Sequence, residues 1–152
     1  MVFKKILVAI DNSPLVSVVF EQALEPAQKE GASLMLFHCI NSDNLSQLTF
    51  LTEAEAKIEQ AQAWLRPYCQ KAKDEGIPTK CVCEVGQPGS SICRLAQSWG
   101  ANLIILGRKD DPGLVKMLLG SVSNHVVHNA PCSVLIIKNE EQSSQQLPGF
   151  EE

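Results

Sequence analysis

Residues 102–137 read NLIILGRKDDPGLVKMLLGSVSNHVVHNAPCSVLII, and this stretch decides the fold. Two short apolar runs, residues 103–106 and 133–137, are typical of strands that are buried on both faces. A polar loop with Gly107 follows the first run, and after an amphipathic segment a helix opens at Gly120. The stretch therefore predicts strand, loop, helix and strand. A glycine-bearing loop before a helix exposes backbone N–H groups and suits a phosphate, although an ordinary strand-to-helix turn has the same pattern.

The rest of the chain repeats this alternation. Five strands that alternate with helices predict an α/β fold, a parallel sheet with helices on both faces, and we expect the strand order 3-2-1-4-5. The 152 residues fit one domain, at residues 1–138. Residues 139–152 carry four glutamates and few apolar groups, so we expect a disordered acidic tail. The other strands are predicted at residues 5–10, 33–40 and 79–85, and the other helices at residues 14–30, 52–75 and 90–99.

Capping signals locate the helix starts. Ser13 before Pro14 predicts that the first helix begins there, with the serine as its N-cap. Thr52, three residues before a glutamate, predicts a capping box at the start of the long helix. Pro26 and Pro67 lie inside helical patterns, where each removes one backbone donor, and we expect a kink at both.

Composition and charge exclude several classes of protein. The net charge of −4 argues against binding in a nucleic-acid groove. No apolar run approaches 18 residues, which argues against a membrane-spanning helix. The sequence MVFKKI leads directly into the first strand and leaves no room for a signal peptide. These features predict a cytoplasmic protein.

Six cysteines and three histidines raise the question of disulfides and metals. In a cytoplasmic chain without a CxxC pair, we expect the thiols to act as small buried apolar groups. Cys81 and Cys83 point to one face of a strand, which also fits a metal or redox role. His125 and His128 lie three residues apart on a helix, but no third ligand is spaced nearby, so we expect no metal site.

Catalytic motifs are absent from the sequence. The loop after Gly107 lacks the Lys and Ser or Thr of a Walker motif, and the first strand is followed by Asp11-Asn12-Ser13 rather than by GxGxxG. No Ser-His-Asp arrangement or acid–base pair has convincing spacing. We expect no dedicated enzyme.

The expected strand order indicates where a ligand binds. In open parallel sheets, ligands bind beyond the carboxyl ends of the strands, where the strand order reverses. If the reversal lies between the first and fourth strands, Asp11 and Gly107 face each other across that crevice. Asp11 can equally serve as a cap of the first helix.

Five places in the sequence form a recognisable set: ILVAIDNS, VGQP, the glycine at 107, GSVS and APCSVLII, at residues 6–13, 85–88, 107, 120–123 and 130–137. Through them the chain resembles the universal stress protein family over roughly residues 3–138. Members that bind ATP share a glycine, two residues, a glycine, nine residues and then glycine with serine or threonine. Gly107 and Gly120-Ser121 stand in register with that motif, and Asp110 occupies the place of the second glycine.

The resemblance implies a Rossmann-like fold of the adenine nucleotide alpha hydrolase type, with a nucleotide across the crevice between the first and fourth strands. Adenine and ribose would border Ala9, Ile10 and Asp11, with Cys39 at the end of the second strand. The ribose and phosphates would follow Leu106, Gly107 and Arg108. Phosphate oxygens would be held by N–H and hydroxyl groups of Gly120, Ser121, Val122 and Ser123.

Asp110 bears on which nucleotide is preferred. Its carboxylate would repel a phosphate, whereas Arg108, Lys109 and Lys116 would offset the repulsion. AMP has one phosphate that need not reach this position. Asp110 or Asp111 would alternatively help hold Mg²⁺ against the phosphates.

Together these observations predict a homodimeric universal stress protein that binds ATP or AMP, with or without Mg²⁺, and acts in stress signalling through a protein partner. The fifth strand, Val134-Leu135-Ile136-Ile137, is too apolar for an unpaired sheet edge, and the resemblance likewise implies a dimer through it. The alternatives are a nucleotide-free dimeric interaction module and a slow ATP hydrolase.

Overall fold

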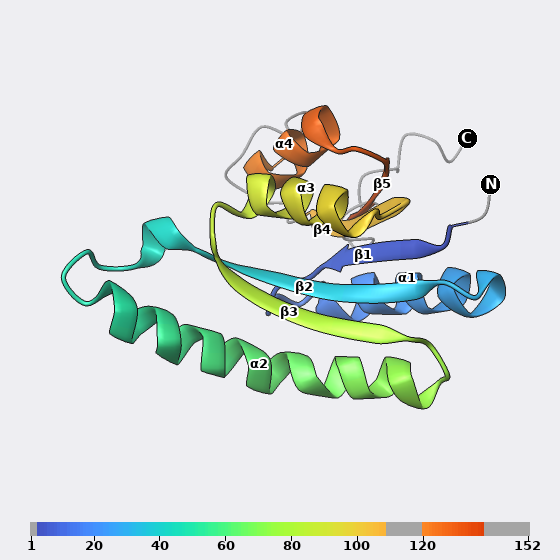
Figure 1. Ribbon diagram of the computed structural model, residues 1–152, viewed down its shortest axis with the longest axis horizontal. Helices are drawn as coiled ribbons and strands as arrows, with labels where there is room; N and C mark the ends of the chain where they lie inside the picture. The colour runs from blue at the N-terminus through green and yellow to red at the C-terminus, as the bar shows by residue number, and fades with distance from the viewer. Residues whose placement is uncertain (1–2, 109–119, 139–152) are drawn as a thin grey trace, which may run out of the picture.

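The computed structural model describes residues 3–108 and 120–138, which form a five-stranded parallel sheet flanked by helices (Figure 1). The strand order is β3-β2-β1-β4-β5, as the sequence predicts. The predicted segments 109–119 and 139–152, with Asp110 and the acidic tail, lie outside the described residues. The elements are β1 (Lys5–Ala9), α1 (Val16–Glu30), β2 (Ser33–Asn41), the 3₁₀ turn η1 (Ser42–Asn44), α2 (Phe50–Asp74), β3 (Thr79–Gly86), α3 (Pro88–Trp99), β4 (Leu103–Arg108), α4 (Ser121–Asn129) and β5 (Ser133–Lys138).

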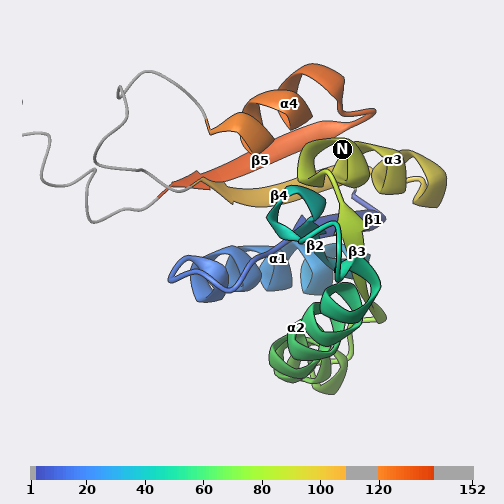
Figure 2. The same cartoon turned by 90° about the vertical axis from the view of Figure 1, so that its left-hand side faces the viewer.

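The sheet separates two apolar clusters. Helices α1 and α2 cover one face of the sheet, and α3 and α4 cover the other; in Figure 2 the two pairs lie below and above the strands. Strand β2 alternates between the two: Leu34 and Leu36 join the cluster under α1 and α2, whereas Met35 and Phe37 join the other. Each fully buried side chain of this kind contributes about 1.5–3 kcal/mol relative to an exposed one.

The start of α1 differs from the prediction. The helix begins at Val16, after a turn in which Val16 N–H donates to the Ser13 carbonyl over 3.0 Å. Ser13 is therefore not the N-cap; its hydroxyl instead accepts from Leu15 N–H over 3.3 Å within that turn. The helix continues through Pro26 and ends at Gly31, whose φ of 66° is the left-handed conformation that glycine adopts without cost.

The start of α2 also differs from the prediction. This helix begins at Phe50, two residues before the predicted capping threonine, so the predicted capping box is wrong. The Thr49 hydroxyl donates to the Glu53 carboxylate instead, and Ser46 N–H donates to the same carboxylate over 3.2 Å. The helix runs unbroken through Pro67.

One pair of cysteines departs from the expectation of free thiols. Cys69 on α2 and Cys81 on β3 form a disulfide, with their Cα atoms 6.3 Å apart. The helix packs along this strand, which brings the two residues together. The other four cysteines are unpaired and half-buried.

No helix within residues 3–108 and 120–138 combines the length and apolar content that crossing a membrane requires.

Candidate functional site

A cavity of about 190 Å³ opens at the carboxyl ends of β1, β2 and β4. This is the point where the strand order reverses, because β1 pairs with β2 on one side and with β4 on the other. Asp11 and Gly107 both line this cavity. The lining residues are Ala9, Ile10, Asp11, Ser13, Leu15, Val16, Val19, Phe37, His38, Cys39, Pro88, Ile92, Leu106, Gly107 and Val122.

Most of this lining is apolar, and its charge lies at the rim. Asp11 lies two residues beyond the end of β1 and is exposed. Its carboxylate accepts no hydrogen bond within the described ranges, so the alternative role of a helix cap is not what it performs here. An apolar interior with a free acidic group at its mouth suits a flat ring system that carries hydroxyl groups.

Three of the eleven predicted site residues do not line the cavity: Gly120, Ser121 and Ser123. Arg108 ends β4, and its side chain lies outside what the structure describes. Gly120 precedes α4 as its N-cap, and Ser121 is exposed at the first position of that helix. Ser123 is 3% exposed, and its hydroxyl donates to the Gly120 carbonyl over 3.2 Å rather than pointing outward. Their predicted contacts with phosphate therefore remain predictions.

Gly107 is explained by packing. A Cβ added there would come within 2.8 Å of a Val19 methyl group, closer than carbon atoms tolerate. Leu15 lies behind it, 3.5 Å from the same point. The absence of a side chain on β4 thus lets the first turns of α1 approach the sheet at the cavity.

Several lining residues were not predicted from the sequence. The turn before α1 contributes Ser13 and Leu15, and the first turn of the helix contributes Val16 and Val19. Helix α3 contributes Pro88 and Ile92. These positions read as ordinary apolar faces of helices, and nothing local in the sequence marks them as cavity walls. Their position in the chain gives a general indication only. The helices that follow β1 and β3 begin beside the carboxyl ends of the strands, where ligands bind in this fold.

His38, near the end of β2, lies in the wall of the cavity. Its Nδ1 lies 2.9 Å from the carbonyl oxygen of Ile10. The oxygen can only accept, so Nδ1 carries the hydrogen and donates it. The ring also packs edge-on against Trp64 of α2, with ring centroids 5.0 Å apart.

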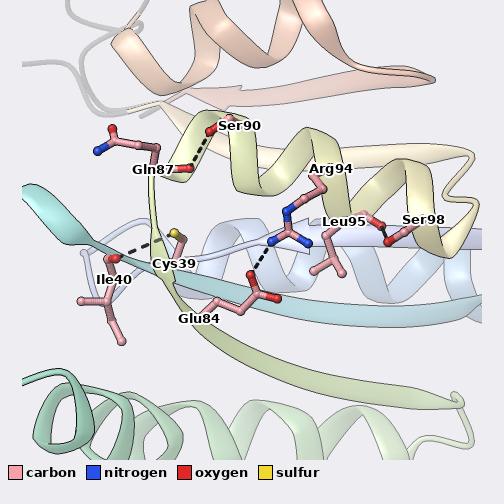
Figure 3. Close-up of polar contacts among 8 residues, drawn as sticks. All are labelled: Cys39, Ile40, Glu84, Gln87, Ser90, Arg94, Leu95 and Ser98. Carbon is pink, nitrogen blue, oxygen red and sulfur yellow. Dashed lines mark hydrogen bonds and ion pairs between the residues drawn. The ribbon is translucent and has the colours of Figure 1, made fainter. Parts of the chain in front are cut away.

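Among the described residues, Cys39 contributes the only sulfur to the cavity wall. Burial raises the pKa of this thiol above its ordinary value of 9.0, and a hydrogen bond with Ser91 opposes part of that rise. The Glu84–Arg94 ion pair, 2.6 Å long, joins β3 to α3 close by (Figure 3). The thiol is therefore protonated at neutral pH and acts as a small apolar wall.

The main chain of Cys39, unlike its side chain, offers hydrogen-bonding groups to the cavity. The β1–β2 ladder ends where Ile10 N–H donates to the Phe37 carbonyl over 2.9 Å. In a parallel ladder the next bonds would join Cys39 N–H to the Ile10 carbonyl and Asn12 N–H to the Cys39 carbonyl. Neither bond forms in the described structure. One donor and one acceptor of the main chain thus point to the side of β2 that β1 has left.

Comparison with known proteins places the chain among relatives of the same size. The Universal stress protein Sll1388 of Synechocystis is 38% identical over 154 residues, covering 91% of this chain and all of that protein. A solved structure of the protein MJ0577 superposes with a TM-score of 0.81 at 26% identity, covering 91% of this chain and 98% of the other.

Two more distant structures share the fold. A universal stress protein in complex with cAMP has a TM-score of 0.68 at 22% identity, covering 90% of this chain and 98% of that one. One from Archaeoglobus fulgidus in complex with dAMP has a TM-score of 0.62 at 22% identity, covering 91% and 100%. The sequence model of the universal stress protein family matches residues 2–138, and the chain belongs to that family.

Proposed function

We propose that the protein binds an adenine nucleotide, ATP or AMP, in the cavity between β1 and β4. The observation that carries this proposal is an apolar cavity with Cys39 at its wall, whose main-chain N–H and C=O bond to no described residue. The Watson–Crick edge of adenine offers an acceptor, N1, beside a donor, the 6-amino group, and so complements such a pair. The complexes of two universal stress proteins with cAMP and dAMP support the same class of ligand.

The size of the cavity favours the base and ribose over the phosphates. Sites that enclose a drug-sized ligand measure about 300–1,000 Å³. A cavity of about 190 Å³ holds a smaller, ring-like part of a ligand. The phosphates would then lie outside it, toward Gly107 and the first turn of α4, where unpaired N–H groups and the helix dipole favour an anion. Asp11 at the rim would accept from the ribose hydroxyls.

The protein would act as a homodimer in stress signalling. Among the described strands, β5 lies at an edge of the sheet and pairs only with β4. Its Leu135 is 41% exposed, and the neighbouring apolar residues of the strand are half-buried. An apolar edge strand with unpaired backbone groups recruits a second strand, and a two-fold axis lets two copies satisfy each other. Sedimentation equilibrium measures the oligomeric state directly.

Calorimetric titration tests nucleotide binding. The probes are AMP and ATP, each with and without Mg²⁺, and IMP as a control, because IMP presents a donor at N1 and an acceptor at C6. Val122→Phe fills the cavity and is expected to abolish binding. Val127→Phe, on the same helix at a position 45% exposed, adds the same bulk outside the cavity and is expected to leave binding intact.

The alternatives predict other outcomes. A nucleotide-free interaction module gives no heat with any of these ligands, and the proposal then fails. IMP that binds as tightly as AMP would contradict the role of the Cys39 main chain. Turnover of ATP that survives exhaustive purification and disappears on substitution of Gly120 would identify a slow hydrolase.

A further inference from the structure

His38 uses the carbonyl oxygen that would accept the next hydrogen bond of the sheet at the site. Continued by one step, the β1–β2 ladder would use the Ile10 carbonyl as the acceptor for Cys39 N–H. The imidazole Nδ1–H of His38 donates to that carbonyl instead, over 2.9 Å. A side chain of β2 has thus taken the place of the strand's own amide group.

The position of the imidazole is secured from two sides. His38 lies on the α1–α2 face of β2, and its ring packs edge-on against Trp64 with centroids 5.0 Å apart. Ile10 is 5% exposed and held by the bond from its own N–H to the Phe37 carbonyl. Donor and acceptor therefore both sit on packed elements, and their geometry is set before any ligand arrives.

We propose that His38 is a positioning residue for the ligand base. By occupying the Ile10 carbonyl, it prevents the sheet from closing over Cys39 N–H and leaves that amide free to donate to the ring nitrogen of adenine. The inference rests on the proposed nucleotide site and adds a residue that itself need not touch the base. It acts through the Cys39 main chain.

Amide hydrogen exchange of the ligand-free protein tests the first half of this inference. In the wild type the Cys39 amide exchanges as an unbonded group. In His38→Leu the Ile10 carbonyl is released, Cys39 N–H donates to it, and exchange at Cys39 slows by about tenfold, the effect of one added hydrogen bond. His38→Asn keeps a donor at the position of Nδ1, and its Cys39 amide stays as exposed as in the wild type.

A matched control separates this effect from the general loss of a histidine. His128 on α4 makes the same kind of bond, with Nδ1 lying 2.9 Å from the Asn124 carbonyl, at an exposed site outside the cavity wall. His128→Leu is expected to leave exchange at Cys39 unchanged. Far-ultraviolet circular dichroism of each variant checks that the fold is intact. Should His38→Leu fail to fold, Trp64→Ala, which releases the ring from its packing, is the substitute.

Ligand selectivity tests the second half. Adenosine and 1-deazaadenosine differ only in the ring nitrogen that Cys39 N–H would contact. The wild type and His38→Asn are expected to prefer adenosine by about tenfold, one hydrogen bond's worth of affinity. His38→Leu binds both compounds with the same weak affinity. A purely structural role of His38 would weaken both ligands equally and preserve the preference.

The outcomes separate the inference from the proposed function. A Cys39 amide that is already protected in the wild type, or one that His38→Leu leaves unchanged, overturns the inference even if nucleotides bind. A preference for adenosine that survives in His38→Leu also overturns it. If the amide behaves as expected and no adenine ligand binds to any variant, the proposed function fails and the effect of His38 on the amide stands.

Discussion

Substituting Gly107 by alanine discriminates between two reasons for a glycine at the end of β4. The resemblance to ATP-binding family members implies close approach of a phosphate, whereas the structure shows close approach of Val19. An added Cβ would lie 2.8 Å from a Val19 methyl group, and Val19 is only 2% exposed, so the side chain has little room to retreat. Overpacking of this kind costs about 1–3 kcal/mol.

The net effect follows from two opposing contributions. Alanine in a strand is favoured over glycine by about 0.5–1 kcal/mol, because glycine loses more backbone entropy on folding. We therefore expect Gly107→Ala to lower the free energy of unfolding by about 1–2 kcal/mol. Val19→Ala alone should cost about 2 kcal/mol, through the loss of two buried methyl groups. In the Val19→Ala background the clash is gone, and Gly107→Ala should raise stability by about 0.5–1 kcal/mol.

Urea unfolding of the four proteins without ligand measures this cycle. With an m value of roughly 2 kcal/mol/M, Gly107→Ala alone should lower the midpoint by about 0.5–1 M. The packing explanation is refuted if Gly107→Ala has the same effect on stability in both backgrounds. Loss of nucleotide affinity with unchanged stability would instead favour the phosphate explanation.

Three further predictions follow from the cysteines and from Asp110. Cys81→Ser removes the disulfide to Cys69, which closes a loop of sequence separation 12. In urea unfolding without reductant, the free energy of unfolding should fall by about 3 kcal/mol, whereas with reductant it should not change. Equal stability of the two proteins without reductant would contradict the pairing. Burial raises the pKa of the Cys39 thiol above 9.0, so the rate of its alkylation by iodoacetamide should still increase as the pH rises through 9. The same rate should fall when AMP is bound. A rate that levels off near pH 8 would be inconsistent with a buried thiol. The resemblance implies that Asp110 would stand near the outer phosphates of ATP. On that premise, Asp110→Gly should tighten ATP by about tenfold in calorimetry while hardly affecting AMP; an equal gain for both nucleotides would rule out charge repulsion.

Hydrophobic pattern and turn residues were sufficient to predict the elements of the fold. The apolar run at residues 103–106 is buried on both faces of the sheet, as its pattern predicts. The run at residues 133–137 also forms a strand, but it is only half-buried because β5 ends the described sheet. The glycines that end α1 and α3 have φ values of 66° and 81°, conformations that few other residues adopt. Helix starts were less predictable, because several nearby side chains compete to cap a helix; Thr49 and Glu53 prevailed over Thr52 in α2.

The site was predictable where it lies on strand ends. Asp11, Cys39 and Gly107 follow or end apolar runs, and parallel strands bring their carboxyl ends to one edge of the sheet. The walls from α1 and α3 were not predictable, since their reach into the cavity depends on how closely each helix packs.

The sequence by itself determined that this is a parallel α/β domain of the universal stress protein family with its cavity at the β1–β4 reversal. Local periodicity and chain chirality leave few other ways to bury these apolar residues. Only the tertiary structure decided that Cys69 meets Cys81, that Val19 explains Gly107 and that His38 takes the Ile10 carbonyl from Cys39. Each of these contacts joins residues on different elements. The distance between the two residues is set by how the elements pack, and no local sequence pattern predicts it.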